Sequence, residues 1–412
     1  MKNATFFTRS ARLSLFPFFF FLVSFLYAAN GNLSGSGTSS SPYIIEDTAD
    51  WNKFASNIND GIDASSFYML SDNFDNTSNP ITTMCGTSES YSFKGTFDGN
   101  AKTLTVNFNV SSENAGPFRY AKNAIIQNLT VTGNITTSNK YAGGFIGSAY
   151  AIVTIQNCIS SVTINSSVNG DGTHGGLIGL AQGGSSIFFT NCLFNGKLLG
   201  SNTHSNSGFL GYNGGVLSTF VNCLFAPEQI TMDSVNSATF NRNGHNSFDN
   251  CYYKKKYGEK HGQDASSLSE AELLALLGGC WEIKEGLLKP LQGQNMLYFA
   301  NVDGLKEIYT ASGISPVDDD YEVSLYGVSL TKNTDYELKI KDESGNEISS
   351  LNKNGRYFLA FNGIGSYMAE KVFPFNYYLY GEGTEESPYL LTDADDWNNF
   401  AKLVNENLGN RF

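Results

Sequence analysis

The sequence predicts an all-β protein: a right-handed parallel β-helix (a solenoid of stacked coils) with short helical caps, followed by a small β-sandwich. Two short motifs recur with a shared period of about 30 residues in the first two thirds of the chain. Around these motifs apolar and β-branched residues alternate at period two, which is typical of strands. Beyond residue 295, turn signals recur about every ten residues, and this spacing predicts a small antiparallel sandwich.

Composition and charge exclude several classes of protein. The chain has 412 residues, of which 41% are hydrophobic and 14% aromatic, so it is too apolar for a disordered tail. Only 16% of the residues are charged and the net charge is −13, which argues against nucleic acid or an anionic membrane as a partner. Abundant glycine with few charges favours a turn-rich β architecture.

Residues 1–29 resemble a secretory signal peptide. Three basic residues and no acidic residue precede the apolar run LSLFPFFFFLVSFLYAA, and small residues at its end allow cleavage after Ala28 or Ala29. The alternative is an uncleaved membrane anchor, but the run is at the short limit for spanning and Pro17 interrupts it. We therefore expect a secreted or cell-surface protein with no transmembrane span after signal cleavage.

Glycine-rich pentads mark the interior repeat. GGFIG at 143–147, GGLIG at 175–179 and SGFLG at 207–211 follow one another at intervals of 32 residues. Glycine at such positions suits tight turns with positive φ and close approach of neighbouring coils. The repeat positions are Gly144, Gly147, Gly176, Gly179, Gly208 and Gly211.

An asparagine series runs out of phase with the pentads. Its members are Asn128, Asn157, Asn191, Asn222 and Asn250. If equivalent residues of successive coils stack, these side chains can form a ladder of hydrogen bonds. Cysteine follows the last four, and along a strand it should point to the opposite side from asparagine, so that one series faces inward. Buried packing is the favoured interpretation of the cysteines, over disulfides or a zinc site.

A helix is predicted at residues 264–279. Ser269 and Glu272 form a capping box, and its leucines would cover the exposed core at the end of the solenoid, with Trp281 completing the cap. A partner-binding helix is the alternative. The β-helix with both caps is expected to span residues 30–294.

The segment at residues 381–405 repeats residues 35–59 at a constant offset of 346. Each copy has a Gly/Ser turn, a short strand and a DW-NxFA helix that carries Trp51 or Trp397. We interpret these tryptophans as parts of N-terminal caps, and a sugar-binding aromatic is the alternative. Residues 379–412 are therefore expected to be the truncated start of a second β-helix module.

Taken together, the repeats resemble those of GLUG-motif bacterial secreted and surface proteins. The pentads resemble the GLUG motif, FKGTFDGNAKTLTV (93–106) is similar to the strand-turn entry of such repeats, and residues 250–291 are similar to their conclusion. The segments VSLTKNTDYELKI and GRYFLAFNGIGSY, within residues 295–378, resemble a bacterial Ig-like module. The resemblance implies a surface or adhesive role.

No catalytic, cofactor-binding or metal-binding residue is predicted. Asp171 is the one acidic residue between 115 and 226, whereas polysaccharide-cleaving sites need clustered carboxylates. His174 and His204 are out of step relative to their pentads, which disfavours a shared metal site. NGDG at 169–172 and the aspartates at 318–320 could offer oxygen atoms to calcium, but a turn and a solvated loop are the favoured interpretations.

The sequence therefore favours an adhesin or rigid stalk that presents a repetitive binding face. Surface glycans or proteins of a host or neighbouring cell are the expected partners, and no cofactor is expected. The contrasting hypotheses are a β-helix polysaccharide-degrading enzyme and a passive spacer. A cluster of carboxylates beside Arg or Lys on one sheet would favour the enzyme.

Overall fold

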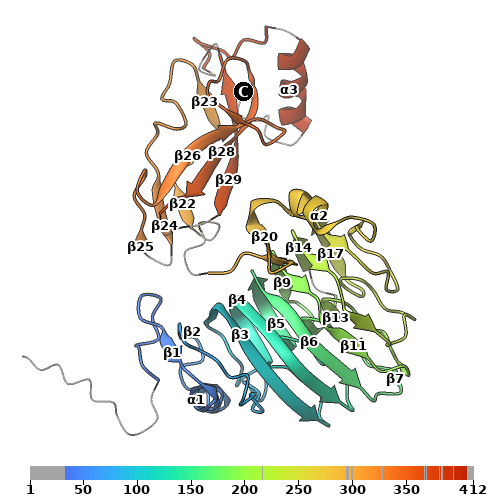
Figure 1. Ribbon diagram of the computed structural model, residues 1–412. Coiled ribbons are helices and arrows are strands. Elements are labelled where there is room, and N and C mark those ends of the chain that lie inside the picture. The colour runs from blue at the N-terminus through green and yellow to red at the C-terminus, as the bar shows by residue number, and fades with distance from the viewer. Residues whose placement is uncertain are drawn as a thin grey trace, which may run out of the picture. The chain divides into compact units, whose positions relative to one another are not determined.

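The computed structural model describes residues 33–405, except 216, 294–296, 298–299, 326–327, 366, 368, 380, 382–383 and 393 (Figure 1). The predicted signal peptide at residues 1–29 lies outside the described residues. No helix within the described part of the chain is long and apolar enough to cross a membrane.

A parallel β-solenoid of about seven turns forms the first part of the chain, which confirms the predicted all-β class and the stacked coils. In Figure 1 its strands lie side by side in sequence order, from blue to green. The strands of the coils form three columns, and each strand pairs in parallel with its counterparts in adjacent coils. Residues about 30 apart therefore lie next to one another, as in the pairing of Ile146 with Ile178 and of Ile178 with Leu210.

The strands are assigned to these columns by their pairing. The first column consists of β1 (Tyr43–Ile45), β2 (Phe67–Leu70), the start of β3 (Thr96–Val110), the middle of β4 (Phe118–Thr137), the end of β5 (Ile146–Gln156), β9 (Ser186–Thr190), β14 (Leu217–Val221) and β17 (His245–Asp249). The second consists of the ends of β3 and β4, β6 (Ile159–Ser166), β10 (Leu193–Phe194), β11 (Lys197–Leu199), β15 (Leu224–Phe225), β16 (Gln229–Ile230), β18 (Tyr252–Tyr253) and β19 (Gln263–Asp264). The third consists of the starts of β4 and β5, β8 (Ile178–Ala181) and β13 (Leu210–Asn213), and β7 (Gly170–Asp171) pairs separately with β12 (Thr203–His204).

Asparagine occupies the corner between the first and second columns. The five asparagines of the repeat have φ between 49° and 55°, a left-handed conformation that asparagine adopts more readily than most residues. Their side chains form a continuous column: Nδ2 of Asn191 donates to Oδ1 of Asn157 at 2.9 Å, and Nδ2 of Asn222 donates to Oδ1 of Asn191 at 2.8 Å. Asp98 begins this column, because its carboxylate accepts from Nδ2 of Asn128 at 3.3 Å.

The expectation that only one of the asparagine and cysteine series faces inward is wrong. Asn157 and Cys158 are both completely buried, and so are their equivalents in the next coil. The alternation of a strand does not apply here, since the left-handed asparagine turns the chain between two strands. All six cysteines are free thiols, and burial raises the pKa of Cys158 and Cys223 well above the usual range of a thiol.

The pentad glycines allow close packing of coils. A Cβ atom added to Gly144 would lie 2.3 Å from the carbonyl oxygen of Gly176, and one added to Gly176 would lie 2.0 Å from that of Gly208. None of the pentad glycines has a positive φ, so that part of the expectation is wrong. They are required because another backbone passes where a side chain would stand.

Helix α1 (Thr48–Asn59) closes the N-terminal end of the solenoid. Trp51 and Phe54 are completely buried, and both rings pack against Phe97 at centroid distances below 6 Å. Nε1 of Trp51 donates to the carbonyl oxygen of Thr83 at 2.9 Å. The DW-NxFA sequence therefore forms a cap whose aromatic residues continue the interior of the first coils.

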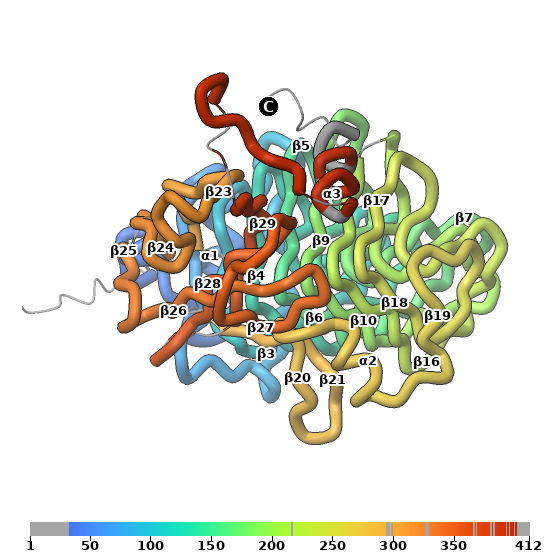
Figure 2. Tube along the Cα trace, turned by 90° about the horizontal axis from the view of Figure 1, so that it is seen from above, coloured from blue at the N-terminus to red at the C-terminus, as the bar shows by residue number. Residues whose placement is uncertain are grey.

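Helix α2 (Glu270–Leu277) packs against a different surface from the one predicted. Its capping box between Ser269 and Glu272 is present, and a 3₁₀ turn, η1 (Gly278–Cys280), leads to the hairpin of β20 (Trp281–Lys284) and β21 (Leu287–Pro290). Leu277 and Trp281 pack on a row of paired residues from successive coils: Ile159, Leu193, Leu224 and Tyr252. The helix and hairpin thus cover the outer side of the second column (Figure 2), not the end of the core.

The region after residue 300 contains two further sheets around a core of their own. The smaller sheet pairs β22 (Asn301–Asp303), β24 (Glu322–Leu325) and β25 (Val328–Ser329). The larger follows the order β23 (Ile308–Thr310), β29 (Glu370–Tyr378), β28 (Gly355–Gly363), β26 (Tyr336–Lys341) and β27 (Glu347–Ile348). Strand β23 pairs with β29 in parallel, so the sheets are not purely antiparallel as predicted. Helix α3 (Ala394–Asn405) follows.

Candidate functional site

A polar pocket opens where loops of successive coils meet near the C-terminal end of the solenoid. It has a volume of about 640 Å³ and is lined by Asp171, Ser205, Ser234, Asn236, Ser237, Arg242, Asn243, Gly258 and Glu259. The pairings of β7 with β12, and of Ser207 with Ala238 and Ala238 with Glu259, bring these loops together. We call this hollow the polar pocket.

The loops around this pocket contain three non-glycine residues in the left-handed conformation. Ser205, Asn236 and Asn243 have φ values of 63°, 51° and 65°, in the left-handed region that non-glycine residues rarely adopt. Neighbouring backbone also passes close by, since a Cβ atom on Gly258 would lie 1.9 Å from the carbonyl oxygen of Ser237. Such backbone positions fix the direction of the polar side chains between them.

Arg242 is the most firmly held charged group of the polar pocket. Its Nη1 donates to the carbonyl oxygen of Ser205 at 2.7 Å and lies 3.3 Å from Oδ1 of Asp171. The guanidinium stands over the ring of Tyr212 at 5.3 Å, a cation–π distance. Only 12% of the side chain is exposed, and its buried Nε has no hydrogen-bond partner within the described residues. The arginine is therefore preorganised by its partners at the edge of the pocket.

Asp171 stands between two cations at the edge of the polar pocket. Nζ of Lys140 lies 3.4 Å from Oδ2, and the hydroxyl of Thr173 donates to Oδ1 at 2.6 Å. Burial alone would raise the pKa of Asp171, but the bond from Thr173 and the charges of Arg242 and Lys140 outweigh it and lower the pKa. Asp171 is therefore an ionised acceptor at neutral pH.

The polar pocket suits a ligand rich in hydroxyl groups. Arg242 supplies a planar set of donors, Asp171 and Glu259 supply carboxylate acceptors, and the serine and asparagine side chains act in both ways. Within the described part of the chain, no group of three or more His, Cys, Asp or Glu residues is placed to hold a metal ion.

The two histidines near the pentads, His174 and His204, have different surroundings. His174 is completely buried: its Nδ1 accepts from the backbone N–H of Ala142 at 3.1 Å, and its Nε2 lies 2.8 Å from the hydroxyl of Ser166. Burial lowers the pKa of His174 to about 3, so it is neutral and structural. His204 contacts the hydroxyl of Ser205 through Nδ1 at 2.8 Å.

In the two candidate calcium loops, an aspartate of each loop forms ion pairs or hydrogen bonds with other side chains. NGDG at 169–172 contains β7, and its aspartate is paired with Lys140 and Arg242. Asp319, in the run at 318–320, is bound by Nζ of Lys306 at 2.6 Å and by the hydroxyl of Tyr309 at 3.2 Å. Burial alone would raise the pKa of Asp319, but the hydrogen bond and charge of Lys306 and the hydrogen bonds from the backbone of Asp320 and from Tyr309 together outweigh it and lower the pKa.

The residues singled out in the sequence lie in the framework of the solenoid. The pentad glycines and the asparagine column are interior, Trp51 is in α1, and Ser269, Glu272 and Trp281 belong to the segment along its side. Trp397, interpreted from the sequence as part of a second N-terminal cap, is 60% exposed. None of these lines the polar pocket. Sequence reasoning missed Arg242, Glu259 and the loop asparagines; the dense NRNGHN run at 241–246 was the available signal.

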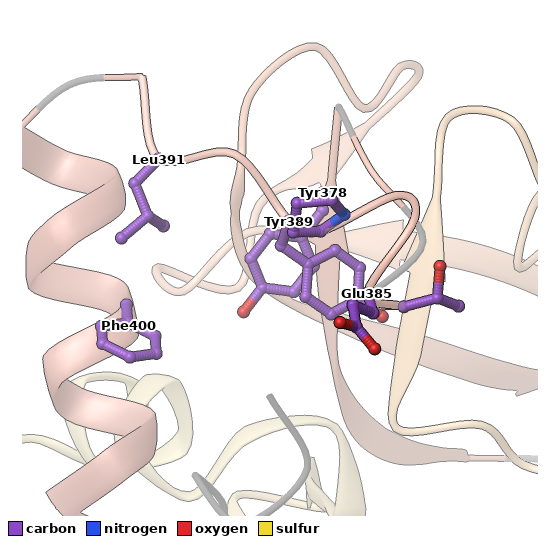
Figure 3. A pocket seen from close by; sticks show the side chains of 7 residues that line it. Tyr378, Glu385, Tyr389, Leu391 and Phe400 are labelled. Atoms are coloured by element: carbon purple, nitrogen blue, oxygen red, sulfur yellow. The ribbon is translucent and has the colours of Figure 1, made fainter.

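A second hollow lies beside α3, and we call it the cap pocket. It has a volume of about 500 Å³ and is lined by Tyr378, Thr384, Glu385, Pro388, Tyr389, Leu391 and Phe400. Figure 3 shows the rings of Tyr378 and Tyr389 stacked, with Leu391 and Phe400 on the side of α3. The two tyrosine centroids are 4.3 Å apart and the rings are inclined by 15°. This surface is mainly apolar, unlike the polar pocket.

Comparison with known proteins identifies no family. No family model matches the sequence, and a search of curated proteins gives no significant match. One solved structure is similar: a "putative immunoglobulin A1 protease" from Bacteroides ovatus, with a TM-score of 0.46 and 16% sequence identity. The similarity covers 62% of this chain and 94% of that one.

Proposed function

We propose that this chain is a secreted or cell-surface modular protein whose solenoid displays a binding site for glycans. The observation that carries the proposal is the polar pocket, where Arg242 lines the hollow and is preorganised by Ser205, Asp171 and Tyr212. A stacked-coil framework holds such a pocket rigidly, and rigid polar groups lose little entropy on binding. The protein would act as an adhesin or as a stalk that presents this site.

Two finer assignments belong to this proposal. The repeated coils are assigned to the GLUG type on the three pentads, and residues 295–378 to an Ig-like module. The second assignment is supported by two sheets around one core. Export is supported by the basic start and apolar run of residues 1–29.

A glycan array probed with the chain tests the proposal. We expect binding to one group of related glycans, and Arg242→Met should weaken that binding about tenfold or more, because a charge-assisted donor is lost. Lys197→Met is the matched control, since Lys197 forms an exposed ion pair with Glu228 outside the polar pocket. Absence of any bound glycan, or equal binding by Arg242→Met and the wild type, would contradict the proposal.

The polar pocket also supports a second candidate function, that of a polysaccharide-degrading enzyme. Asp171 and Glu259 both line it beside Arg242, and two carboxylates are the groups that most glycoside hydrolases use. Incubation of the chain with its best array ligand, followed by measurement of new reducing ends, separates the two. If the chain cleaves the glycan, and if Glu259→Gln abolishes cleavage but keeps binding, the proposed function becomes that of an enzyme and not of an adhesin.

A further inference from the structure

Residues 35–59 and 381–405 share a local structure as well as a sequence. Helices α1 (Thr48–Asn59) and α3 (Ala394–Asn405) begin and end at equivalent positions. In each copy an aspartate of the first turn accepts from a backbone N–H four residues earlier: Asp50 from Glu46 at 2.9 Å and Asp396 from Thr392 at 2.6 Å.

The turn before each helix is also the same. Gly35 and Gly381 have φ values of 102° and 87°, and a Cβ atom on either would lie within about 2 Å of a proline carbonyl oxygen, that of Pro42 or Pro388. Only glycine fits such a turn. The two segments are therefore two copies of one folded unit.

The first copy shows what this unit is built to cover. Trp51, Phe54, Ala55 and Ile58 of α1 are completely buried. The ring of Phe54 lies 4.6 Å from that of Tyr68 and 5.7 Å from that of Phe93, both residues of the first turns of the solenoid. The apolar face of the helix is thus filled by inward aromatic side chains of parallel coils.

The second copy presents the same face without that cover. Trp397 is 60% exposed, and Leu390 and Leu391 are 52% and 37% exposed. Leu391 and Phe400, the counterparts of the buried Ile45 and Phe54, line the open cap pocket (Figure 3). Exposed apolar surface of this kind, rimmed by polar residues, marks an interaction site.

We propose that residues 381–405 are a docking unit for the first coil of a further β-solenoid, built like the coil that covers α1. The occupant is a parallel coil with phenylalanine or tyrosine side chains directed inward, which would fill the cap pocket and bury Trp397. The argument rests on the covered copy in this same chain and does not depend on the polar pocket or its ligand.

Replacement of the first copy by the second tests the docking unit directly. In the full chain, residues 35–59 are replaced by residues 381–405, so that Trp397 takes the place of Trp51. We expect the solenoid to keep its cooperative thermal transition and the transplanted tryptophan to resist acrylamide quenching. The same replacement with Trp397→Ala in the transplanted copy is the matched control, and it should lower that transition markedly. Loss of the solenoid transition in the exchanged chain, with the later sheets still folded, would overturn the proposal.

A second measurement follows Trp397 in its own position. Residues 60–293 are joined after Asn405 of the full chain, which supplies a coil in the arrangement found after α1. The difference in emission between this extended chain and its Trp397→Phe variant reports Trp397 alone. We expect a blue shift and reduced quenching relative to the chain without the extension. A folded extension that leaves Trp397 exposed would overturn the proposal, and concentration-dependent burial in the unextended chain would assign the surface to a second copy instead.

Discussion

At the scale of single residues, the structure explains why asparagine recurs where strand alternation gives no reason for a polar side chain. The corner between two columns needs φ near 50°, and the buried side chain there needs both a donor and an acceptor along the axis. Asparagine meets both requirements, because it tolerates the left-handed region and has both groups. The period of this residue is visible in the sequence, whereas its conformation is not.

Buried His174 gives the solenoid a pH-dependent stability. Burial lowers its folded-state pKa to about 3 from the ordinary 6.5, with Asp171 opposing the shift. Since the folded state holds the neutral ring, its stabilising contribution is complete above pH 6.5. As pH falls from 6.5 towards 3 the unfolded chain takes up the proton first, and the free energy of unfolding should decrease by up to about 1.4 kcal/mol per pH unit.

The measurement is urea unfolding of the wild type and of His174→Gln between pH 7 and pH 4. The variant should be less stable at pH 7, because it loses packing and a hydrogen bond, but the difference between the two chains should shrink as pH falls. Both chains contain the same carboxylate groups, so the pH dependence of the difference in their free energies of unfolding reports His174 alone. The matched control is His245→Gln at an exposed histidine, which should keep the wild-type slope. Parallel curves for the wild type and His174→Gln would contradict the assignment.

At the scale of elements, α2 shows what sequence can and cannot predict about a helix. Its start at the capping box of Ser269 and Glu272 could be predicted, because side chains three residues apart satisfy the first backbone N–H groups. Its site of packing could not, because leucines occupy 273, 274, 276 and 277 and define no single narrow face. The structure selects Leu273 and Leu277, which pack on the row from Ile159 to Tyr252 along the outside of the coils.

Two adjacent leucines of α2 provide a matched pair of variants. Leu277 is 3% exposed and packs on the coils, whereas Leu276 is 46% exposed. We expect Leu277→Ala to destabilise the solenoid by about 2–4 kcal/mol, since it leaves a cavity against four coils. Leu276→Ala should change stability by less than about 0.5 kcal/mol, because its backbone carbonyl still accepts from Asn250. Equal effects in chemical denaturation would show that α2 does not pack on the solenoid as described.

At the scale of the whole molecule, the parallel solenoid could be predicted because one period governs two independent motifs, and stacking turns that period into columns. The polar pocket could not be predicted in the same way. Asp171, Arg242 and Glu259 come from different coils and share no repeat position, so their proximity follows from loop lengths that have no period. The same holds for the exposed face of α3, since the sequence repeats the cap but does not show whether it is covered.

Among the described residues, the apolar core inside the coils and the apolar core between the later sheets are separate, and no residue belongs to both. In a stacked-coil protein each coil is stabilised mainly by its neighbours, so damage to one coil should affect the solenoid alone. Asn191, in the middle of the column, bonds to the asparagines on both sides and has a φ of 50°. Its replacement should therefore lower one thermal transition and leave the other unchanged.

We expect Asn191→Gly, which keeps the left-handed conformation, to cost roughly 1–3 kcal/mol through the two lost hydrogen bonds. Asn191→Ala should cost about 1 kcal/mol more, because alanine is strained at that φ. Asn236→Ala is the control for strain alone, since Asn236 has a φ of 51° but is exposed and outside the column. Calorimetry of the three variants should show the solenoid transition lowered most by Asn191→Ala, less by Asn191→Gly and least by Asn236→Ala, with the transition of the later sheets fixed. If Asn191→Gly melts like the wild type, the column aligns the coils without stabilising them; if both transitions move together, the two cores unfold as one unit.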